Sequence, residues 1–439
     1  MSGAAPPPLP VTVLRGHSSG VQAVCYLTDN ILLSGSQDGL VKIWSLERRR
    51  ACGKFQATSR RDTGVQRLDR LGRDRVVSQG RDTLINVWDA ERLACSGGGG
   101  GGGQEKTLTA EPLQQLPTGA FHFCQFALTR CSSSSSSSSS NAIHASSGSR
   151  LREDDDSGDQ DQRRGRTETH EELPGTENDG ASAAEAAAGA AAVEPKPATP
   201  PEADEGEEPN CTPEGSAFQE NVMLAPCGEQ HSISVWDLRE GRPAFMFAPK
   251  DAARKGMVMC VRLLGESSSC PSPFAVTGHD SGHLCVYDLR ATSAEPLLES
   301  RLHTAPMVCV DVGSSCKQGV SGSADESIHI FRISIRKASC RVVKTFSLEH
   351  PGTSCLEIRR DQKLFVSGGW DHRVRAFSWK SPRPLAVLRS HEKNVHAVAY
   401  SPRLGGLVSG SGDSRVAVWE LFPDKKGGGD LGGAHGGVS

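Results

Sequence analysis

Apolar and polar residues alternate in seven short segments of this chain, and each segment ends at an aromatic residue. In the first segment, Val41 and Ile43 are apolar, Lys42 between them is charged, and Trp44 follows. The residues one and three positions before each aromatic are all apolar; the aromatics are Trp44, Trp88, Trp236, Tyr287, Phe331, Phe377 and Trp419. A period of two places alternate side chains on one face of a β-strand. The pattern therefore predicts seven strands, each buried on one face.

The seven segments recur at a nearly even spacing. Successive aromatics are 42 to 51 residues apart, except for the 148 residues between Trp88 and Trp236. A repeat of about 40–50 residues is typical of units that must pack on one another to bury their apolar faces. We therefore predict an all-β fold, a seven-bladed β-propeller, in which ring closure leaves only short sheet edges. Closure further predicts that residues 11–14 form the outer strand of the seventh blade, beside residues 416–421.

Polar residues recur at fixed distances from these aromatics. Five aromatics have an Asp six positions before them and a Ser ten before, and four of these Asp follow a His by 21 or 22 residues. With Gly16-His17 at the start, these segments resemble WD repeats, a family in which His, Ser or Thr, Asp and Trp form a hydrogen-bonded network inside a blade. The resemblance assigns four structural tetrads: His17, Ser34, Asp38 and Trp44; His303, Ser321, Asp325 and Phe331; His350, Ser367, Asp371 and Phe377; and His391, Ser409, Asp413 and Trp419.

The His and Asp of a tetrad have a second interpretation, because such a pair can act in acid–base catalysis. Recurrence at constant spacing in several repeats favours the structural role. Phe331 and Phe377 lack the N–H donor of Trp, so the last hydrogen bond of the network is expected to be missing there. The second, third and fourth repeats show no matching His.

Four cysteines lie in mostly apolar surroundings, at similar places in the first predicted strand of their repeats: Cys25, Cys260, Cys309 and Cys355. This position favours buried structural thiols over metal ligands or nucleophiles. The chain has 14 cysteines but no Cys-x-x-Cys pair, and its N-terminus shows no basic-then-apolar signal pattern. We therefore expect reduced thiols and a location in the cytoplasm, with the nucleus as a further compartment.

Between the second and third segments the chain becomes low in complexity. Seven consecutive glycines begin at Gly97, nine consecutive serines begin at Ser132, and acidic, Ala-rich and Pro-rich stretches follow. Such sequences do not offset the entropy lost when the backbone orders. The predicted organisation is a disordered N-terminus at 1–10, blades one to three at 11–131, a disordered acidic insert in the third-blade region at 132–217, the remaining propeller at 218–424 and a disordered Gly-rich tail at 425–439. The insert is either inert or a regulatory tether.

The formal net charge of −3 is unevenly distributed. Residues 132–217 hold 19 acidic and 6 basic side chains, so the rest of the chain is basic. Arg48–Arg50 and Arg60-Arg61 either form part of a face for acidic peptide segments or are ordinary solvated loop charges. The scarcity of aromatic residues and the lack of a recognition motif argue against a nucleic-acid partner. No run of 18 apolar residues exists, so no membrane-spanning helix is expected.

Sequence motifs for catalysis are almost absent. The chain has no G-x-x-x-x-G-K-[ST] phosphate loop and no H-E-x-x-H metal motif. Gly16–Gly20 matches G-x-S-x-G, but a nucleophile elbow needs a helix after its Ser, and residues 21–25 read as a strand. We therefore predict that the protein is not an enzyme and that it uses no cofactor and no metal.

Two C-terminal segments narrow the resemblance to a family of G-protein-β-like WD-repeat proteins. They are Ser367–Phe377, which contains Trp370-Asp371-His372-Arg373, and Trp419–Pro423. The resemblance implies a non-catalytic scaffold that acts with the TTT co-chaperone machinery. In this role it would help phosphatidylinositol-3-kinase-related kinases mature and persist, and so support DNA-damage signalling. The expected partners are proteins, namely that co-chaperone complex and those large kinases, bound by a monomeric propeller.

Two other functions stay open from the sequence. One is a G-protein-β-like signalling subunit. True β subunits hold a γ subunit through a long N-terminal helix, but only ten residues, several of them Pro, precede the first predicted strand. Because Pro opposes such a helix, no γ subunit is expected by coiled coil. The other open function is a nuclear or ubiquitin-ligase WD adaptor.

Overall fold

The computed structural model describes residues 8–95, 105–119, 124–128, 222–226, 232–247, 252–264, 273–291, 295–381, 383–402 and 405–422. All of them belong to one compact unit, which consists of Met1–Ser133 and Pro213–Ser439. The predicted disorder of 132–217, of 425–439 and of residues 1–7 lies outside the described residues.

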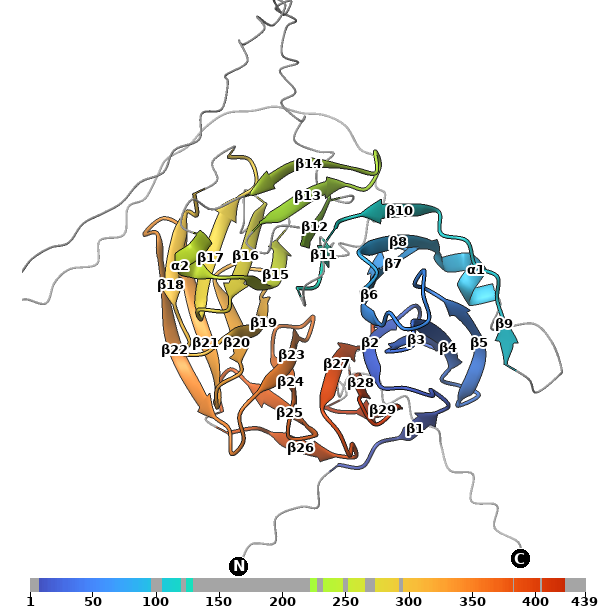
Figure 1. The fold of residues 1–439 in the computed structure, drawn as a ribbon. Helices are drawn as coiled ribbons and strands as arrows, with labels where there is room; N and C mark the ends of the chain where they lie inside the picture. The colour runs from blue at the N-terminus through green and yellow to red at the C-terminus, as the bar shows by residue number, and fades with distance from the viewer. Residues whose placement is uncertain are drawn as a thin grey trace, which may run out of the picture. The chain divides into compact units, whose positions relative to one another are not determined.

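The described residues form seven sheets, which Figure 1 shows arranged around a common centre. The first sheet contains β2 (Val21–Tyr26), β3 (Ile31–Ser36), β4 (Leu40–Ser45), β5 (Arg50–Gln56) and the short β9 (Lys106–Thr107). The second contains β6 (Val65–Leu71), β7 (Arg75–Gly80), β8 (Leu84–Asp89) and β10 (Gln114–Pro117), with α1 (Ala90–Cys95) between its last two strands in the chain. The third contains β11 (Ala127–Leu128), β12 (Val222–Pro226), β13 (Ile233–Asp237) and β14 (Arg242–Phe247).

The other four sheets repeat the same order of strands from the centre outward. The fourth follows α2 (Ala252–Lys255) and contains β15 (Val258–Leu264), β16 (Phe274–His279), β17 (His283–Asp288) and β18 (Leu298–Arg301). The fifth contains β19 (Met307–Val312), β20 (Gln318–Ser323), β21 (Ser327–Ser334) and β22 (Ser339–Ser347). The sixth contains β23 (Thr353–Ile358), β24 (Leu364–Gly369), β25 (Arg373–Ser378) and β26 (Ala386–Arg389). The seventh contains β27 (Val395–Tyr400), β28 (Gly406–Ser411), β29 (Arg415–Glu420) and β1 (Thr12–Arg15).

Each alternating segment of the sequence forms the third strand of its sheet, so these strand predictions are confirmed. The expectation of one buried face was too narrow. In β4, Val41 and Ile43 are fully buried, but Lys42 on the opposite face is also buried. Asn86 in β8 and Cys285 in β17 are buried in the same way. The reason is that each sheet has a neighbour on both of its faces.

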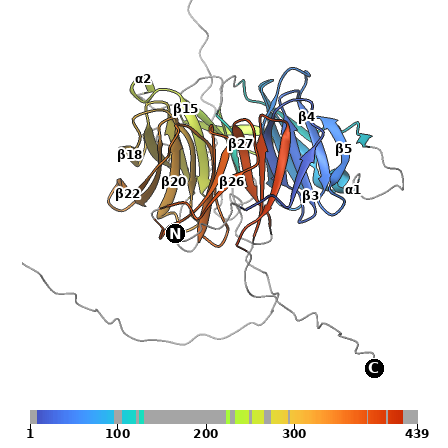
Figure 2. The ribbon, with the colours of Figure 1, turned by 90° about the horizontal axis from the view of Figure 1, so that it is seen from below.

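Seven apolar clusters fill the spaces between consecutive sheets, and the last cluster joins the seventh sheet to the first. Glycines in the second strands allow the close approach. A Cβ on Gly35 would lie 2.6 Å from Val65 of the next sheet, and a Cβ on Gly410 would lie 2.7 Å from Val21. Figure 2, turned by 90°, shows the strands crossing the thickness of the ring. The chain is therefore an all-β propeller, as predicted.

The predicted closure by the N-terminal strand is confirmed. β1 pairs antiparallel with β29 as the outermost strand of the seventh sheet, with Leu14 opposite Val416. The strand runs from Thr12 to Arg15, one residue later than predicted, although Val11 N donates a hydrogen bond to Val418 O at 2.8 Å. The ring is thus joined by hydrogen bonds between segments from the two ends of the sequence.

Candidate functional site

The predicted tetrad of the seventh sheet forms a complete hydrogen-bonded chain. His391 Nδ1 lies 3.0 Å from Asp413 Oδ2, and its Nε2 lies 2.8 Å from Ser409 Oγ. Trp419 Nε1 donates to the same Ser409 Oγ at 2.9 Å. Asp413 also accepts a hydrogen bond from Glu392 N, so this hydrogen-bonded network links β28 and β29 to the loop before β27.

The tetrad of the first sheet is only partly assembled. His17 Nε2 lies 2.6 Å from Ser34 Oγ, which accepts a hydrogen bond from Trp44 Nε1 at 2.7 Å. Asp38 is not bonded to His17, because its carboxylate accepts hydrogen bonds from the Ser18 and Ser36 hydroxyls instead. Burial raises the pKa of Asp38, but these hydrogen bonds outweigh it, so the pKa lies below its usual value.

In the fifth sheet the His–Ser and His–Asp contacts are both present. His303 Nδ1 lies 3.1 Å from Asp325 Oδ2, and Nε2 lies 2.9 Å from Ser321 Oγ. Phe331 is fully buried and has no donor for Ser321, as the sequence indicated. His329 stacks on His303 with 4.3 Å between ring centroids.

The tetrad predicted for the sixth sheet does not form at its His. His350 is exposed, while Ser367 and Phe377 are buried. Asp371 is instead bonded by both terminal nitrogens of the Arg375 guanidinium, which approaches from the neighbouring strand β25. The assignment of His350 was therefore wrong, because a cation on the same sheet already satisfies the carboxylate that the His was expected to bind.

The sequence missed a histidine in the fourth sheet. His279 lies at the end of β16, and its Nε2 lies 2.9 Å from Thr277 Oγ1. Residues two apart in a strand share a face, so the signal was the spacing Thr277-Gly278-His279 within one strand. In the second and third sheets the Trp side chain is hydrogen-bonded to a Ser hydroxyl without a tetrad His. Trp88 Nε1 donates to Ser78 Oγ at 2.8 Å, and Trp236 Nε1 donates to Ser234 Oγ at 2.7 Å.

The buried imidazoles are held in their neutral form. Burial lowers the pKa of His17, of His279 and of His303 to about 4 in each case. Lys42 lowers the pKa of His17 further, whereas Asp325 partly opposes the shift at His303. A neutral imidazole can donate a hydrogen bond through one nitrogen and accept one through the other, so it can link two strands. These buried rings are poorly accessible to a substrate.

These pKa values predict that stability falls in mild acid. The unfolded chain binds more protons than the folded chain between pH 4 and pH 6.5, so the free energy of unfolding decreases as the pH falls through that window. Each such His contributes about 1.4 kcal/mol per pH unit where it is fully titrating. Urea unfolding at pH 7.5 and at pH 5.0 measures the difference, which should shrink in His303→Gln. The same change at exposed His350 is the matched control, and equal pH dependence in all three chains would contradict the prediction.

Three of the four cysteines singled out in the sequence are buried, and Cys355 is partly exposed. All four lie in inner strands, where burial raises the pKa of Cys260 and of Cys355 to about 12 and that of Cys25 and Cys309 well above the usual value. Cys260 Sγ contacts Met307 O at 3.6 Å and Cys309 Sγ contacts Thr353 O at 3.5 Å, each in the next sheet. Such thiols stay protonated, so their surroundings suit a structural role.

The inner strands carry a feature that the sequence did not reveal. Six of them bulge after their first residue, and each bulge leaves one residue outside the ladder: Gln22, Gln66, Met259, Val308, Ser354 and His396. A bulge redirects the side chain of its extra residue and often lies beside a binding site. The bulges therefore lie on the innermost strands, beside the centre of the ring (Figure 1).

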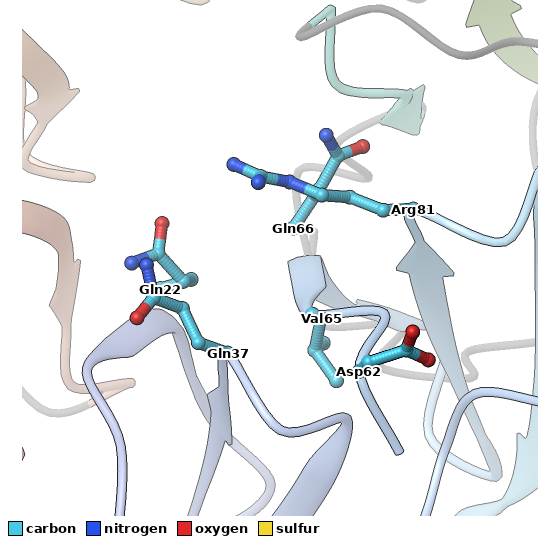
Figure 3. Close-up of a pocket in the computed structure, with 7 residues that line it drawn as sticks. Gln22, Gln37, Asp62, Val65, Gln66 and Arg81 are labelled. Carbon is cyan, nitrogen blue, oxygen red and sulfur yellow. The ribbon is translucent and has the colours of Figure 1, made fainter. Parts of the chain in front are cut away.

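Two of these bulge residues line a pocket between the first and second sheets. Gln22 and Gln37 lie on one side of it, and Gln66 and Arg81 lie on the other (Figure 3). The Nε2 atom of Gln22 is buried and has no hydrogen-bond partner among the described residues. We name this pocket, with Gln22, Gln37, Asp62, Gln66 and Arg81, the channel pocket.

The charge of Arg81 also affects His396 of the seventh sheet. Burial lowers the pKa of His396, and the Arg81 guanidinium lowers it further. Glutamine amides donate to and accept from a peptide backbone, and a guanidinium binds carboxylates in a fixed geometry. The channel pocket thus has the chemistry to hold an extended protein segment. No group of three or more His, Cys, Asp or Glu residues is placed to bind a metal ion within the described ranges.

Comparison with known proteins agrees with this architecture. The model of the WD domain, G-beta repeat, matches residues 9–45 and 382–420. These matches place WD repeats in the first and last parts of the all-β propeller. It is 32% identical over 206 residues to guanine nucleotide-binding protein subunit beta-like protein 1 of Mus musculus, covering 47% of this chain and 62% of the relative.

Further relatives are fungal. The chain is 30% identical to ASTRA-associated protein 1 of Schizosaccharomyces japonicus, across 34% of this chain and 43% of the relative. It is 23% identical to ASTRA-associated protein 1 of Aspergillus flavus, across 93% of this chain and 86% of the relative. The first two alignments cover less than two thirds of each relative. In the part of the chain with described coordinates, no helix is long and apolar enough to span a membrane.

Proposed function

We propose that this protein is a non-catalytic WD-repeat scaffold, built as one closed seven-bladed propeller, that binds protein segments at the channel pocket. The observation that carries the proposal is the pair of bulges that hold Gln22 and Gln66 at the centre, beside Arg81. The paired inner strands position these groups before a partner arrives, which lowers the entropy cost of binding. The tetrads, in this proposal, stabilise the blades and take no part in chemistry.

The names of the relatives support a more specific role. Several fungal relatives are called ASTRA-associated protein 1. Together with the resemblance seen in the sequence, these names support the role of an adaptor in an ASTRA assembly. We place this role in the cytoplasm and nucleus. In that role the scaffold acts with a co-chaperone complex to support the maturation and stability of phosphatidylinositol-3-kinase-related kinases, and so DNA-damage signalling.

Affinity purification with mass spectrometry tests this function. The tagged wild-type chain should enrich co-chaperone subunits and large kinases, and Arg81→Glu should reduce their recovery by about tenfold or more, since a reversed charge in a binding pocket costs a large part of the affinity. Arg341→Glu, an exposed site on outer strand β22, is the matched control and should leave recovery unchanged.

Three results would overturn the proposal. The first is no enrichment of kinases or co-chaperones by the wild-type chain. The second is enrichment of a γ subunit, which assigns a G-protein-β-like role. The third is enrichment of histone tails or ubiquitin-ligase components, which assigns the other WD adaptor role. Equal recovery with both Arg variants would place the binding surface away from the channel pocket.

A further inference from the structure

The outer edge of the first sheet is covered by a segment of the chain itself. Among the described residues this is the only sheet with a fifth strand, and β9 is the only strand that pairs in parallel. Gly53 lies opposite Lys106 and Lys54 lies opposite Thr107, and Leu108 N donates to Lys54 O at 2.8 Å. We name residues 105–108 the strap; Figure 1 shows β9 beside β5.

A buried positive charge lies beside the first residue of the strap. Lys42, in β4, is 6% exposed, and its Nζ lies 2.6 Å from Glu105 Oε1 of the strap. Lys54 Nζ lies 3.6 Å from the other oxygen, Oε2, of the same carboxylate. A buried ammonium needs an anion beside it, so whatever covers the edge must supply a carboxylate at this point.

This requirement is particular to the first sheet. The equivalent positions in the other six third strands are occupied by Asn86, Ser234, Cys285, His329, Arg375 and Ala417. Arg375 alone among these carries a permanent charge, and its partner Asp371 comes from its own sheet. Lys42 takes its carboxylate from a segment outside the four-stranded repeat.

An apolar position lies three residues further along the strap. Leu108 packs against the apolar cluster shared by the first and second sheets. The edge strand has Gly53 at this place, and a Cβ there would lie 3.5 Å from Leu108 Cδ1. The edge therefore recognises two features of an extended strand: a carboxylate, and a leucine-sized side chain three residues after it.

The backbone ladder of the strap is short. It spans two residues, and the side chains of Lys106 and Thr107 are exposed. Segments with short ladders open locally at a lower free-energy cost than core strands do. An extended segment of another protein with the same two features would make the same contacts, because strand addition relies on backbone hydrogen bonds and alternate side-chain pockets.

We propose that the β5 edge of the first sheet is a docking site for an extended segment of a partner protein with the pattern acidic-x-x-Leu, and that the strap occupies this site in the free chain. The site is separate from the channel pocket and does not depend on the function proposed for it.

A peptide-binding experiment on the full chain tests the proposal. The probe is a fluorescent peptide with the sequence of residues 104–111, and the receptor chain carries Glu105→Gln with Leu108→Ser to weaken the strap. The peptide should bind this chain about tenfold more tightly than it binds the wild type, which the strap protects. A chain with Glu111→Gln, a carboxylate outside the ladder, is the matched control and should behave as the wild type.

The second arm changes the probe. A peptide with Gln and Ser in place of its Glu and Leu should lose about tenfold in affinity for the strap-weakened chain. Equal affinities for both chains, or for both peptides, would overturn the proposal. Glu105→Gln alone serves for the same comparison if the double variant does not fold. A wild-type dimer that the peptide dissociates would assign the edge to a second copy, and would also overturn it.

Discussion

Asp311→Ala should lower the free energy of unfolding by about 3–5 kcal/mol, the usual cost of breaking a buried ion pair by removing one partner. Asp311, in β19, is 1% exposed. Its Oδ1 lies 3.0 Å from Nε of Arg262 in the fourth sheet. Its Oδ2 accepts a hydrogen bond from Ile358 N in the sixth sheet at 2.8 Å. One carboxylate thus links three consecutive sheets. Its removal takes the anionic partner away from the Arg262 guanidinium and an acceptor away from the Ile358 N–H.

Urea unfolding monitored by tryptophan fluorescence measures this loss. Asp74→Ala is the control, because Asp74 is also an acidic residue beside an Arg but its side chain is 69% exposed. Exposed ion pairs contribute about 0–1 kcal/mol, so the control should unfold close to the wild type. If the two variants unfold at the same urea concentration, Asp311 does not link the sheets as argued.

Local patterns in the sequence were sufficient to predict the repeating parts of the fold. Alternation around each aromatic gave the third strands, and closure placed residues 11–14 beside the last strand. Ser34 and Trp44 are ten residues apart in the chain, and the hairpin of β3 and β4 brings them together directly. Where a contact is made within one hairpin, spacing alone identifies it.

Contacts between sheets were not predictable in this way. Arg262 and Asp311 occupy the same position of the inner strand in neighbouring repeats, and no spacing within one repeat pairs them. Lys42 meets Glu105 only because a segment beyond the second repeat's helix returns to the first sheet. His350 had the right spacing, but Arg375 binds its expected partner. Such outcomes depend on which charged group lies close enough to pair with a site in the folded structure.

Leu14→Ala should destabilise the propeller by about 2–5 kcal/mol, the cost of removing a buried leucine side chain and leaving a cavity. Leu14 is 2% exposed, and it belongs to the apolar cluster that joins the seventh sheet to the first, with Val21, Trp44 and Val416. The effect should be large for a four-residue edge strand, because β1 contributes both hydrogen bonds and core packing at the closure of the ring.

The neighbouring residue in the same strand provides the control for this last prediction. Val13→Ala removes apolar carbons from the opposite face of β1, where the side chain is only partly buried, so its cost should be well below that of Leu14→Ala. Thermal and urea unfolding of the two variants measure the difference. Equal, small losses would mean that β1 rests on the seventh sheet without closing the ring. A large loss at Leu14 alone means that the fold depends on a strand from the start of the sequence completing its last sheet.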